Sequence, residues 1–184
     1  MKLKGIEISF KKLVCLVLYY GVFRNWPNNK LFLGGGQWLR YQLCKQIFKK
    51  CGKNVNVERG ANFGSGRNVE IGDNSGIGVN ASIPSNTIIG KDVMMGPNCY
   101  ILPHNHAFDR LDIPMCQQGF TEKKTTIIED DVWIGRDVLM TPGRRISTGT
   151  IIAGGTVLCK DFPEYSIVGG NPSKFIKNRK DDKI

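Results

Sequence analysis

The two histidines of this 184-residue chain, His104 and His106, lie one residue apart between residues 101 and 110. A neutral imidazole has a pKa near 6.5, which suits it to act as a general base at neutral pH. Such a base removes the proton of a hydroxyl group, which is otherwise a poor nucleophile, as the oxygen attacks a carbonyl carbon. The pair therefore indicates a candidate general-base site, unless the two residues share a loop by chance.

The sequence on both sides of the histidines repeats every six residues. The position after each repeated aliphatic residue is often glycine, and the position four residues after it is small or β-branched. A helix would space its apolar residues by three and four, and a half-buried strand would space them by two. A period of six predicts a solenoid of short straight segments, three to a triangular coil, with glycine-rich corners that absorb the bends. The repeated aliphatic residues are Ile71, Ile77, Ile83, Ile89, Met95 and Ile101, and then Ile128, Ile134, Met140, Ile146, Ile152 and Leu158.

The period is lost from residue 107 to residue 124 and resumes after Thr125. This segment is therefore predicted to project from a regular coil as a loop, and it begins directly after His106. Function concentrates on loops that a rigid scaffold holds in place. The position of the two histidines thus favours a functional role over chance.

The hexads resemble those of the hexapeptide-repeat acyltransferases, over about residues 55–179. The resemblance is sharpest in DDVWIGRDVLMTPG (residues 130–143) and in residues 151–179. The sugar O-acetyltransferases, which include galactoside, maltose and surface-polysaccharide enzymes, look like the closest branch. The resemblance implies an all-β solenoid, a left-handed parallel β-helix of hexapeptide repeats with an N-terminal helical arm and a short C-terminal helix. It also implies acetyl-CoA-dependent O-acetylation of a carbohydrate hydroxyl by direct transfer, on a surface polysaccharide or lipid-linked saccharide precursor, in a homotrimer with sites between subunits.

The same resemblance assigns the histidines. The run NHAFD (residues 105–109) is similar to the family's Asn-His-x-x-Asp, so His106 is the expected general base and Asp109 is expected on the substrate side. His104 is the second catalytic candidate. The loop of residues 107–124 is expected to reach a neighbouring subunit, so that the histidine of one chain meets coenzyme bound with another.

The resemblance also implies binding residues for substrate and coenzyme. Asn80 and Trp133 are the expected substrate contacts, with Trp133 near the thioester. Arg144 stands where a small residue is expected, and burying an unpaired arginine is costly, so it should point outward, toward the coenzyme phosphates. The expected coenzyme contacts are Arg136, Gly154, Thr156, Cys159, Lys160 and Lys174.

The net charge of +10 belongs to the N-terminal arm. Residues 1–53 hold eleven Lys and Arg and one acidic residue, whereas the remaining chain holds fifteen of each sign. An eleven-residue apolar run, Leu13 to Phe23, lies in this arm and is too short to cross a bilayer, which takes about 20 residues. Two placements stay open: the run packs on the domain, or residues 1–30 lie on an anionic membrane surface.

Three regions follow from these patterns. Residues 1–53 form a basic, partly helical arm, in which residues 36–50 have helical spacing and are expected to cap the open core. Residues 54–170 form the β-helix with its projecting loop. Residues 171–184 form a basic tail that is predicted to be a short helix.

Several function classes are disfavoured. Six cysteines without CxxC spacing, and no cleavage pattern after Phe23, indicate reduced thiols in a cytoplasmic protein, peripheral at the inner membrane face if the arm binds lipid. Two histidines are too few for a three-histidine zinc site, so no metal is expected. The basic arm lacks a nucleic-acid-reading motif, so no nucleic acid is expected. Two alternatives stay open: N-acetylation of an amino sugar or antibiotic, and a non-catalytic β-helix docking module.

Overall fold

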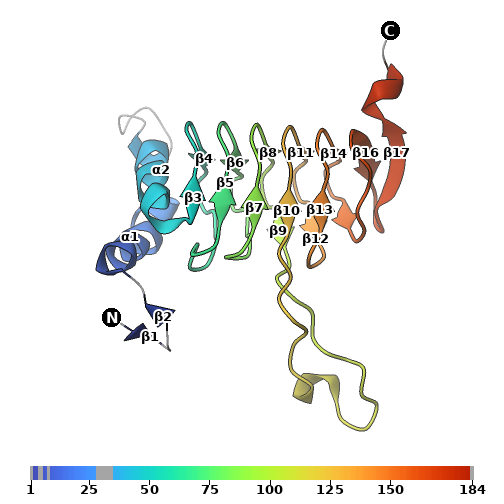
Figure 1. The fold of residues 1–184 in the computed structure, drawn as a ribbon, viewed down its shortest axis with the longest axis horizontal. Helices are drawn as coiled ribbons and strands as arrows, with labels where there is room; N and C mark the ends of the chain where they lie inside the picture. The colour runs from blue at the N-terminus through green and yellow to red at the C-terminus, as the bar shows by residue number, and fades with distance from the viewer. Residues whose placement is uncertain (1, 4–5, 8, 28–34, 183–184) are drawn as a thin grey trace.

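The computed structural model describes all residues except 1, 4–5, 8, 28–34 and 183–184. The chain is a straight solenoid with two helices at its N-terminal end and an antiparallel strand at its C-terminal end (Figure 1). A long loop, which contains the 3-10 helix η3 (Met115–Gln117), projects from the middle of the solenoid. Parts of the predicted arm, among them residues 28–30, lie outside the described residues.

Each coil contributes short strands to three sides of the solenoid. The first side is a parallel sheet of β3 (Lys50–Cys51), β5 (Glu70–Ile71), β7 (Ile88–Ile89), β10 (Ile127–Ile128) and β13 (Arg145–Ile146). The second contains β4 (Asn56–Val57) paired with β6 (Gly76–Ile77), and the sheet of β8 (Met94–Met95), β11 (Trp133–Ile134), β14 (Ile151–Ile152) and β16 (Ser166–Gly169). The third contains β9 (Tyr100–Ile101), β12 (Leu139–Met140) and β15 (Val157–Leu158).

The core is the one that the hexads predict. The register pairs Ile71 with Ile89 and Ile89 with Ile128, so the repeated aliphatic residues of successive coils stack on one another. All twelve of them are buried except Met95, which is partly buried. The small and β-branched residues four positions later are buried as well, from Ser75 to Thr156.

The glycines that follow the aliphatic residues have a different role from the predicted one. A Cβ on Gly72 would lie 2.6 Å from the carbonyl oxygen of Gly90, and one on Gly78 would lie 2.1 Å from that of Gly96. These glycines therefore permit the close approach of the next coil. The prediction that they absorb the bends is wrong. The bends fall at other positions with positive φ, such as Asn80 (54°) and the later glycine Gly155 (72°).

The N-terminal helices lie over the first coil. After a short antiparallel pair, β1 (Lys2–Leu3) and β2 (Ile6–Glu7), come α1 (Phe10–Gly21), the 3-10 helix η1 (Phe23–Asn25) and α2 (Gly35–Ile47). Tyr19 of α1 is fully buried and donates a hydrogen bond to the carbonyl oxygen of Ala61 at 2.9 Å. Arg40 of α2 is also fully buried, and its guanidinium donates to the carbonyl oxygens of Val57 (2.7 Å), Phe23 (3.2 Å) and Trp26 (2.9 Å).

The C-terminal tail departs from the predicted helix. It forms β17 (Lys174–Asn178), which pairs antiparallel with β16, and ends in the 3-10 helix η4 (Arg179–Asp182) (Figure 1). The physical reason is the open edge of β16, whose backbone groups need partners, and the tail supplies them. Helical spacing of a few basic residues was too weak a signal to reveal this.

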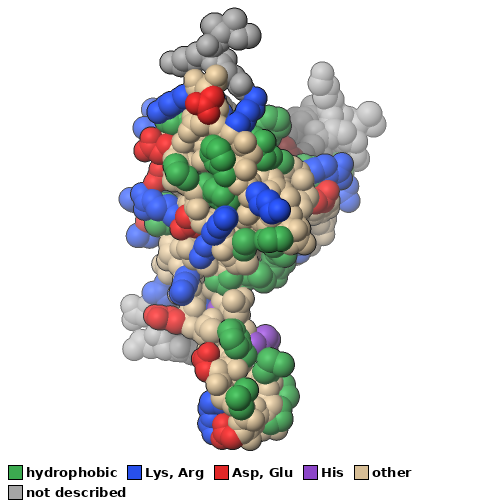
Figure 2. Space-filling model, turned by 90° about the vertical axis from the view of Figure 1, so that its right-hand side faces the viewer, with side chains coloured by type: hydrophobic (Ala, Val, Ile, Leu, Met, Phe, Trp, Pro, Cys, Tyr) green, Lys and Arg blue, Asp and Glu red, His purple; other side chains and the backbone are tan. Residues whose placement is uncertain are grey.

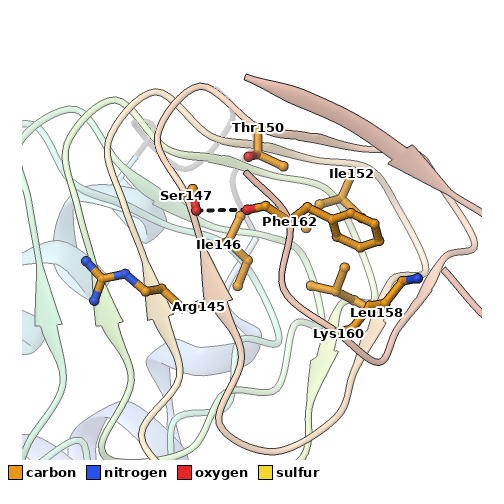
Figure 3. Close-up of a pocket in the computed structure, with 8 residues that line it drawn as sticks. All are labelled: Arg145, Ile146, Ser147, Thr150, Ile152, Leu158, Lys160 and Phe162. Carbon is orange, nitrogen blue, oxygen red and sulfur yellow. Dashed lines mark hydrogen bonds between the residues drawn. The ribbon is translucent and has the colours of Figure 1, made fainter. Parts of the chain in front are cut away.

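The last coil closes the hydrophobic core. Phe162 continues the first side beyond Ile146, and its carbonyl oxygen accepts a hydrogen bond of 2.9 Å from the Ser147 hydroxyl (Figure 3). The space left among Phe162, Ile152 and Leu158 is about 10 Å³. That volume holds about one water molecule, so this end of the core is no ligand site.

Candidate functional site

The two histidines lie at the root of the projecting loop, where its two arms pair with each other. The backbone N–H of Thr121 donates to the carbonyl oxygen of Asn105 at 2.8 Å, and that of Ala107 donates to Gly119 at 3.1 Å. The Asn105 N–H donates to the Thr121 hydroxyl at 3.0 Å. In Figure 2 a histidine is visible at the surface where the loop leaves the solenoid. The paired arms thus hold His106 on a ribbon rather than on a free tip.

Phe120 contacts both imidazoles. Its ring centroid lies 4.5 Å from that of His104 and 4.4 Å from that of His106. His104 is half-buried, and its Nδ1 atom is buried without a hydrogen-bond partner among the described residues, whereas His106 is exposed. Sequence reasoning missed Phe120 because it lies in a segment without a period, so no pattern marked its contact with the histidines. Asp109 is exposed on the same loop.

Asn80 belongs to a column of polar side chains along one edge of the solenoid. Its Nδ2 donates to Asn98 Oδ1 at 3.4 Å, and Asn98 Nδ2 donates to Asp137 Oδ1 at 2.9 Å. Arg136 Nε donates to the other Asp137 oxygen at 2.9 Å. The hydrogen bonds from Asn98 and then Arg136 hold the pKa of Asp137 below its usual value. The edge therefore gives Asn80 a structural role and leaves Arg136 as an exposed cation.

Gly154 lies against Arg136 on the next coil. A Cβ on Gly154 would approach the Arg136 carbonyl oxygen to 3.3 Å and its Cγ to 3.5 Å, and the Gly155 N–H donates to that oxygen at 2.9 Å. The exposed backbone here would let a ligand approach closely. Thr156, by contrast, is fully buried, and its hydroxyl donates to the Ala153 carbonyl oxygen at 2.6 Å. The Thr156 hydroxyl therefore stabilises the turn between two strands and does not face solvent.

Ser173 holds Cys159, which directly precedes Lys160 in the chain. The Ser173 hydroxyl accepts from the Cys159 N–H at 3.2 Å and contacts its sulfur at 3.5 Å, and Lys174 is the next residue. The hydrogen bond with Ser173 lowers the pKa of the Cys159 thiol. Cys159, Lys160 and Lys174 are exposed, while Ser173 is buried. Sequence reasoning missed Ser173, although its place beside Lys174 in NPSK could have suggested it.

Arg144 does not extend freely into solvent. Its Nη1 donates to the Cys159 carbonyl oxygen at 3.0 Å and lies 3.4 Å from Asp161 Oδ1. As expected, Arg144 stays out of the hydrophobic core. Its guanidinium, however, binds the backbone at Cys159 instead of extending toward a coenzyme.

One chain does not bring all the expected residues together. Trp133 is half exposed on β11 of the second side, in register with Met94 and Ile151. The histidine loop leaves from the end of β9 on the third side, which is also the side of Cys159. Thr141 and Leu102 precede Cys159 in the hydrogen-bonded ladder, which puts the loop root about two strand spacings, roughly 10 Å, from Cys159.

A polar groove of about 480 Å³ runs beside the loop root. Pro103 and Lys123, from the two arms of the loop, form part of its wall. Tyr100, which is about half exposed, offers an aromatic ring within it. The remaining polar lining is Asn62, Asn68, Ser82, Ser85 and Asn86.

Within the described part of the chain, no group of three or more His, Cys, Asp or Glu side chains could hold a metal ion. No helix of the described residues is long and apolar enough to cross a membrane.

Comparisons with known proteins agree with the repeat and the fold. Residues 68–103 match the family model for bacterial transferase hexapeptide (six repeats). A maltose O-acetyltransferase from Clostridium difficile 630 has a TM-score of 0.74 and 28% identity, covering 91% of this chain and 86% of its own. A galactoside acetyltransferase in complex with coenzyme A has a TM-score of 0.75 and 26% identity, covering 91% of this chain and 80% of its own.

Curated relatives match over a shorter region. A chloramphenicol acetyltransferase from Klebsiella aerogenes is 43% identical over 61 residues, which is 33% of this chain and 29% of that protein. The match therefore spans less than a third of that relative's length. The six-residue repeat, the three-sided solenoid and the structural similarity over most of the chain lead to one conclusion: residues 68–103 carry the hexapeptide repeat of bacterial transferases, and the chain has the left-handed parallel β-helix fold of the hexapeptide-repeat acetyltransferases that it resembles.

Proposed function

We propose that this protein is an acetyl-CoA-dependent O-acetyltransferase that acts on a carbohydrate hydroxyl, with His106 as general base. The observation that carries the proposal is the placement of an exposed histidine on a paired ribbon at the root of the loop, on the third side of the solenoid, whose last strand β15 leads directly into the exposed Cys159 and Lys160. The similarity to a maltose O-acetyltransferase and to a coenzyme A complex supports the acyl group, the donor and the acceptor class.

The proposed reaction is a direct transfer. Neutral His106 takes the proton of the acceptor hydroxyl as its oxygen attacks the thioester carbonyl carbon. The new C–O bond forms and the C–S bond breaks, so that coenzyme A leaves as a thiolate, which takes the proton from the imidazolium. The products are an O-acetyl ester and the free thiol, and His106 returns to its neutral form.

The donor would bind along the cationic side of the last coils. Coenzyme A carries several phosphate charges, which Lys160 and Lys174 could meet as exposed cations. Gly154 and Arg136 offer exposed backbone and a further cation on the adjacent edge. Since Trp133 lies on another side of the solenoid from the histidine loop, we propose a homotrimer in which a neighbouring chain completes each site.

The polar groove at the loop root supports a polyhydroxyl acceptor. Its amide and hydroxyl side chains can exchange hydrogen bonds with sugar hydroxyls, and the Tyr100 ring can pack against the apolar face of a sugar. The similarity to a chloramphenicol acetyltransferase favours a second candidate, an antibiotic acceptor. Another alternative is N-acetylation of an amino sugar. A third is that the protein is not an enzyme and serves as a β-helix docking module.

Calorimetric titration with acetyl-CoA tests the donor before the acceptor is known. We expect saturable binding, weakened in Lys160→Ala/Lys174→Ala and retained in His106→Ala. The matched control is Lys53→Ala/Lys91→Ala, which removes the same charge from exposed lysines elsewhere. Absence of binding to the wild-type protein would reject the transferase and leave the docking module.

The acceptor is tested by mass spectrometry of maltose, galactosides, glucosamine and chloramphenicol incubated with enzyme and acetyl-CoA. Acetylated maltose or galactoside, lost in His106→Ala although that variant still binds acetyl-CoA, is the expected result. Acetylation of glucosamine at nitrogen or of chloramphenicol alone would replace the proposed acceptor class.

A further inference from the structure

Helix α1 has an exposed apolar face as well as a buried one. Tyr19 and Tyr20 face the first coil, where the Tyr20 hydroxyl donates to the Gly64 carbonyl oxygen at 2.8 Å. Residues spaced by three and four on the other side are exposed, which is the spacing of one helix face. Beside them a Cβ on Gly21 would meet nothing within 4 Å. The apolar face consists of Phe10 (77% exposed), Val14 (40%), Val17 (63%), Leu18 (39%) and Val22 (46%).

The charge around this face is positive. The first 53 residues hold the whole net charge of +10. Lys11 is exposed and lies within the helix beside the apolar face, and Lys12 follows it. Arg24, at the end of this segment, is used internally, because it donates to the Gly60 carbonyl oxygen. A cationic helix with an exposed apolar face matches the composition of helices that lie in the plane of an anionic membrane.

We propose that the apolar face of α1 docks on an anionic phospholipid surface, with Phe10, Val14 and Val17 among the acyl chains and Lys11 at the headgroups. Helix α1 has 12 residues and does not span a bilayer, so the contact is superficial and reversible. This proposal does not depend on the acyl-transfer reaction.

Two features favour lipid over other occupants. Nucleic acid would be attracted by the charge, but five exposed apolar side chains give it nothing to bind. A second copy of the chain would bring the same cationic arm against itself and would meet charge repulsion. An anionic bilayer satisfies both the apolar face and its positive charge. Figure 1 shows α1 at the N-terminal end of the solenoid, away from the projecting loop, which leaves from the middle.

Co-sedimentation of the full-length protein with vesicles tests the proposal. Vesicles of phosphatidylcholine are compared with vesicles of phosphatidylcholine mixed with phosphatidylglycerol. We expect binding to the mixed vesicles, weakened when salt shortens the Debye length from about 10 Å at 0.1 M to about 3 Å at 1 M. Lys11→Gln/Lys12→Gln should weaken it about 25-fold, because each basic residue near such a surface contributes about fivefold.

Val17→Glu should weaken binding at least tenfold, since it replaces a buried valine contact of about 1.5 kcal/mol or more with a charge. Glutamate is a good helix former, so the helix should persist, which circular dichroism checks. The matched control is Phe175→Glu, an exposed apolar residue at the opposite end of the solenoid. Lys91→Gln/Lys180→Gln, which removes two exposed lysines outside the basic arm, controls for the loss of charge. Both controls should bind vesicles as the wild type does.

Three results would overturn the proposal. The first is no binding to phosphatidylglycerol vesicles, or equal binding by the wild type and Val17→Glu. The second is that Val17→Glu binds vesicles as the wild type does but has a lower oligomer mass than the wild type in light scattering. The apolar face would then be an interface with a second copy of the chain. The third is binding of a DNA duplex without binding of vesicles, which would assign the arm to nucleic acid.

Discussion

A Gly78→Ala substitution would place a methyl group between two coils in the middle of the solenoid. The new Cβ would lie 2.1 Å from the carbonyl oxygen of Gly96 and 2.6 Å from that of Met95. Both are backbone atoms, and an ordinary contact would be 3.4–4 Å. Successive coils are about 4.8 Å apart, so relief would require a local separation that lengthens their hydrogen bonds.

The size of the effect follows from this geometry. Overpacking a core with movable side chains costs about 1–3 kcal/mol, and here the obstacle is backbone. We therefore expect Gly78→Ala to lower the free energy of unfolding by about 3 kcal/mol or more. Two matched variants separate the possible causes. Gly76→Ala meets its nearest atom, the Asn56 carbonyl oxygen, at 3.6 Å and should be neutral or stabilising by about 0.4–1 kcal/mol. Gly155→Ala meets no atom within 4 Å but has φ +72°, and should cost about 1–2 kcal/mol.

Urea unfolding at one fixed protein concentration, followed by circular dichroism, measures all three variants. The expected order of stability is Gly76→Ala, then Gly155→Ala, then Gly78→Ala. If Gly78→Ala and Gly76→Ala had the same free energy of unfolding, close approach of the coils would not be the reason for glycine at position 78. If Gly155→Ala were the least stable, the bends rather than the stacking would limit the fold.

Three further predictions concern the cap, the first side and the loop. Arg40→Met should lower the free energy of unfolding by about 3 kcal/mol or more, because three carbonyl oxygens lose their donor at roughly 1–3 kcal/mol each; thermal unfolding measures it. Hydrogen bonds from Lys49 and then Lys50 hold the pKa of Glu70 below its usual value, so its contribution to stability is present above pH 4.5 and is lost as the pH falls through the lowered value. Glu70→Gln should therefore flatten the fall of Tm with pH below 4.5, and an unchanged slope would contradict this. Under the proposed function, Phe120→Ala should lower kcat about tenfold or more while the Kd for acetyl-CoA stays constant, and Phe120→Tyr should restore activity; a loss of coenzyme binding instead would indicate a general structural defect.

The core could be predicted from the sequence because the solenoid repeats one local rule. Each aliphatic residue of a hexad occupies the same place in its coil, so Ile77 and Ile134, although 57 positions apart, are both fully buried. A strict period also shows where regularity stops, and the loop after His106 was found in this way. What the period could not give is the reason for each glycine. Whether a small residue serves a bend or a close approach depends on the neighbouring coil, as Gly78 shows.

The supporting residues of the candidate site could not be predicted for a related reason. Phe120 meets His106 because the two arms of the loop pair, and this pairing leaves no period in the sequence. Ser173 reaches Cys159 because β17 folds back along β16, where a helix was expected. In both cases the contact depends on an antiparallel return of the chain, whereas the hexads report only parallel stacking.

The straightness of the solenoid limits what one chain can do alone. Residues on different sides of a stacked core cannot approach each other without breaking the coils, so Trp133 on the second side stays apart from His106 at the end of the third. Among the described residues, the projecting loop is the long segment free of that constraint, and its exposed apolar residues, such as Leu111 (98%), could contact another chain. If the proposed transfer needs both His106 and Trp133, activity per chain should therefore fall on dilution into the range where subunits separate, and Leu111→Ser should move that fall to higher concentration.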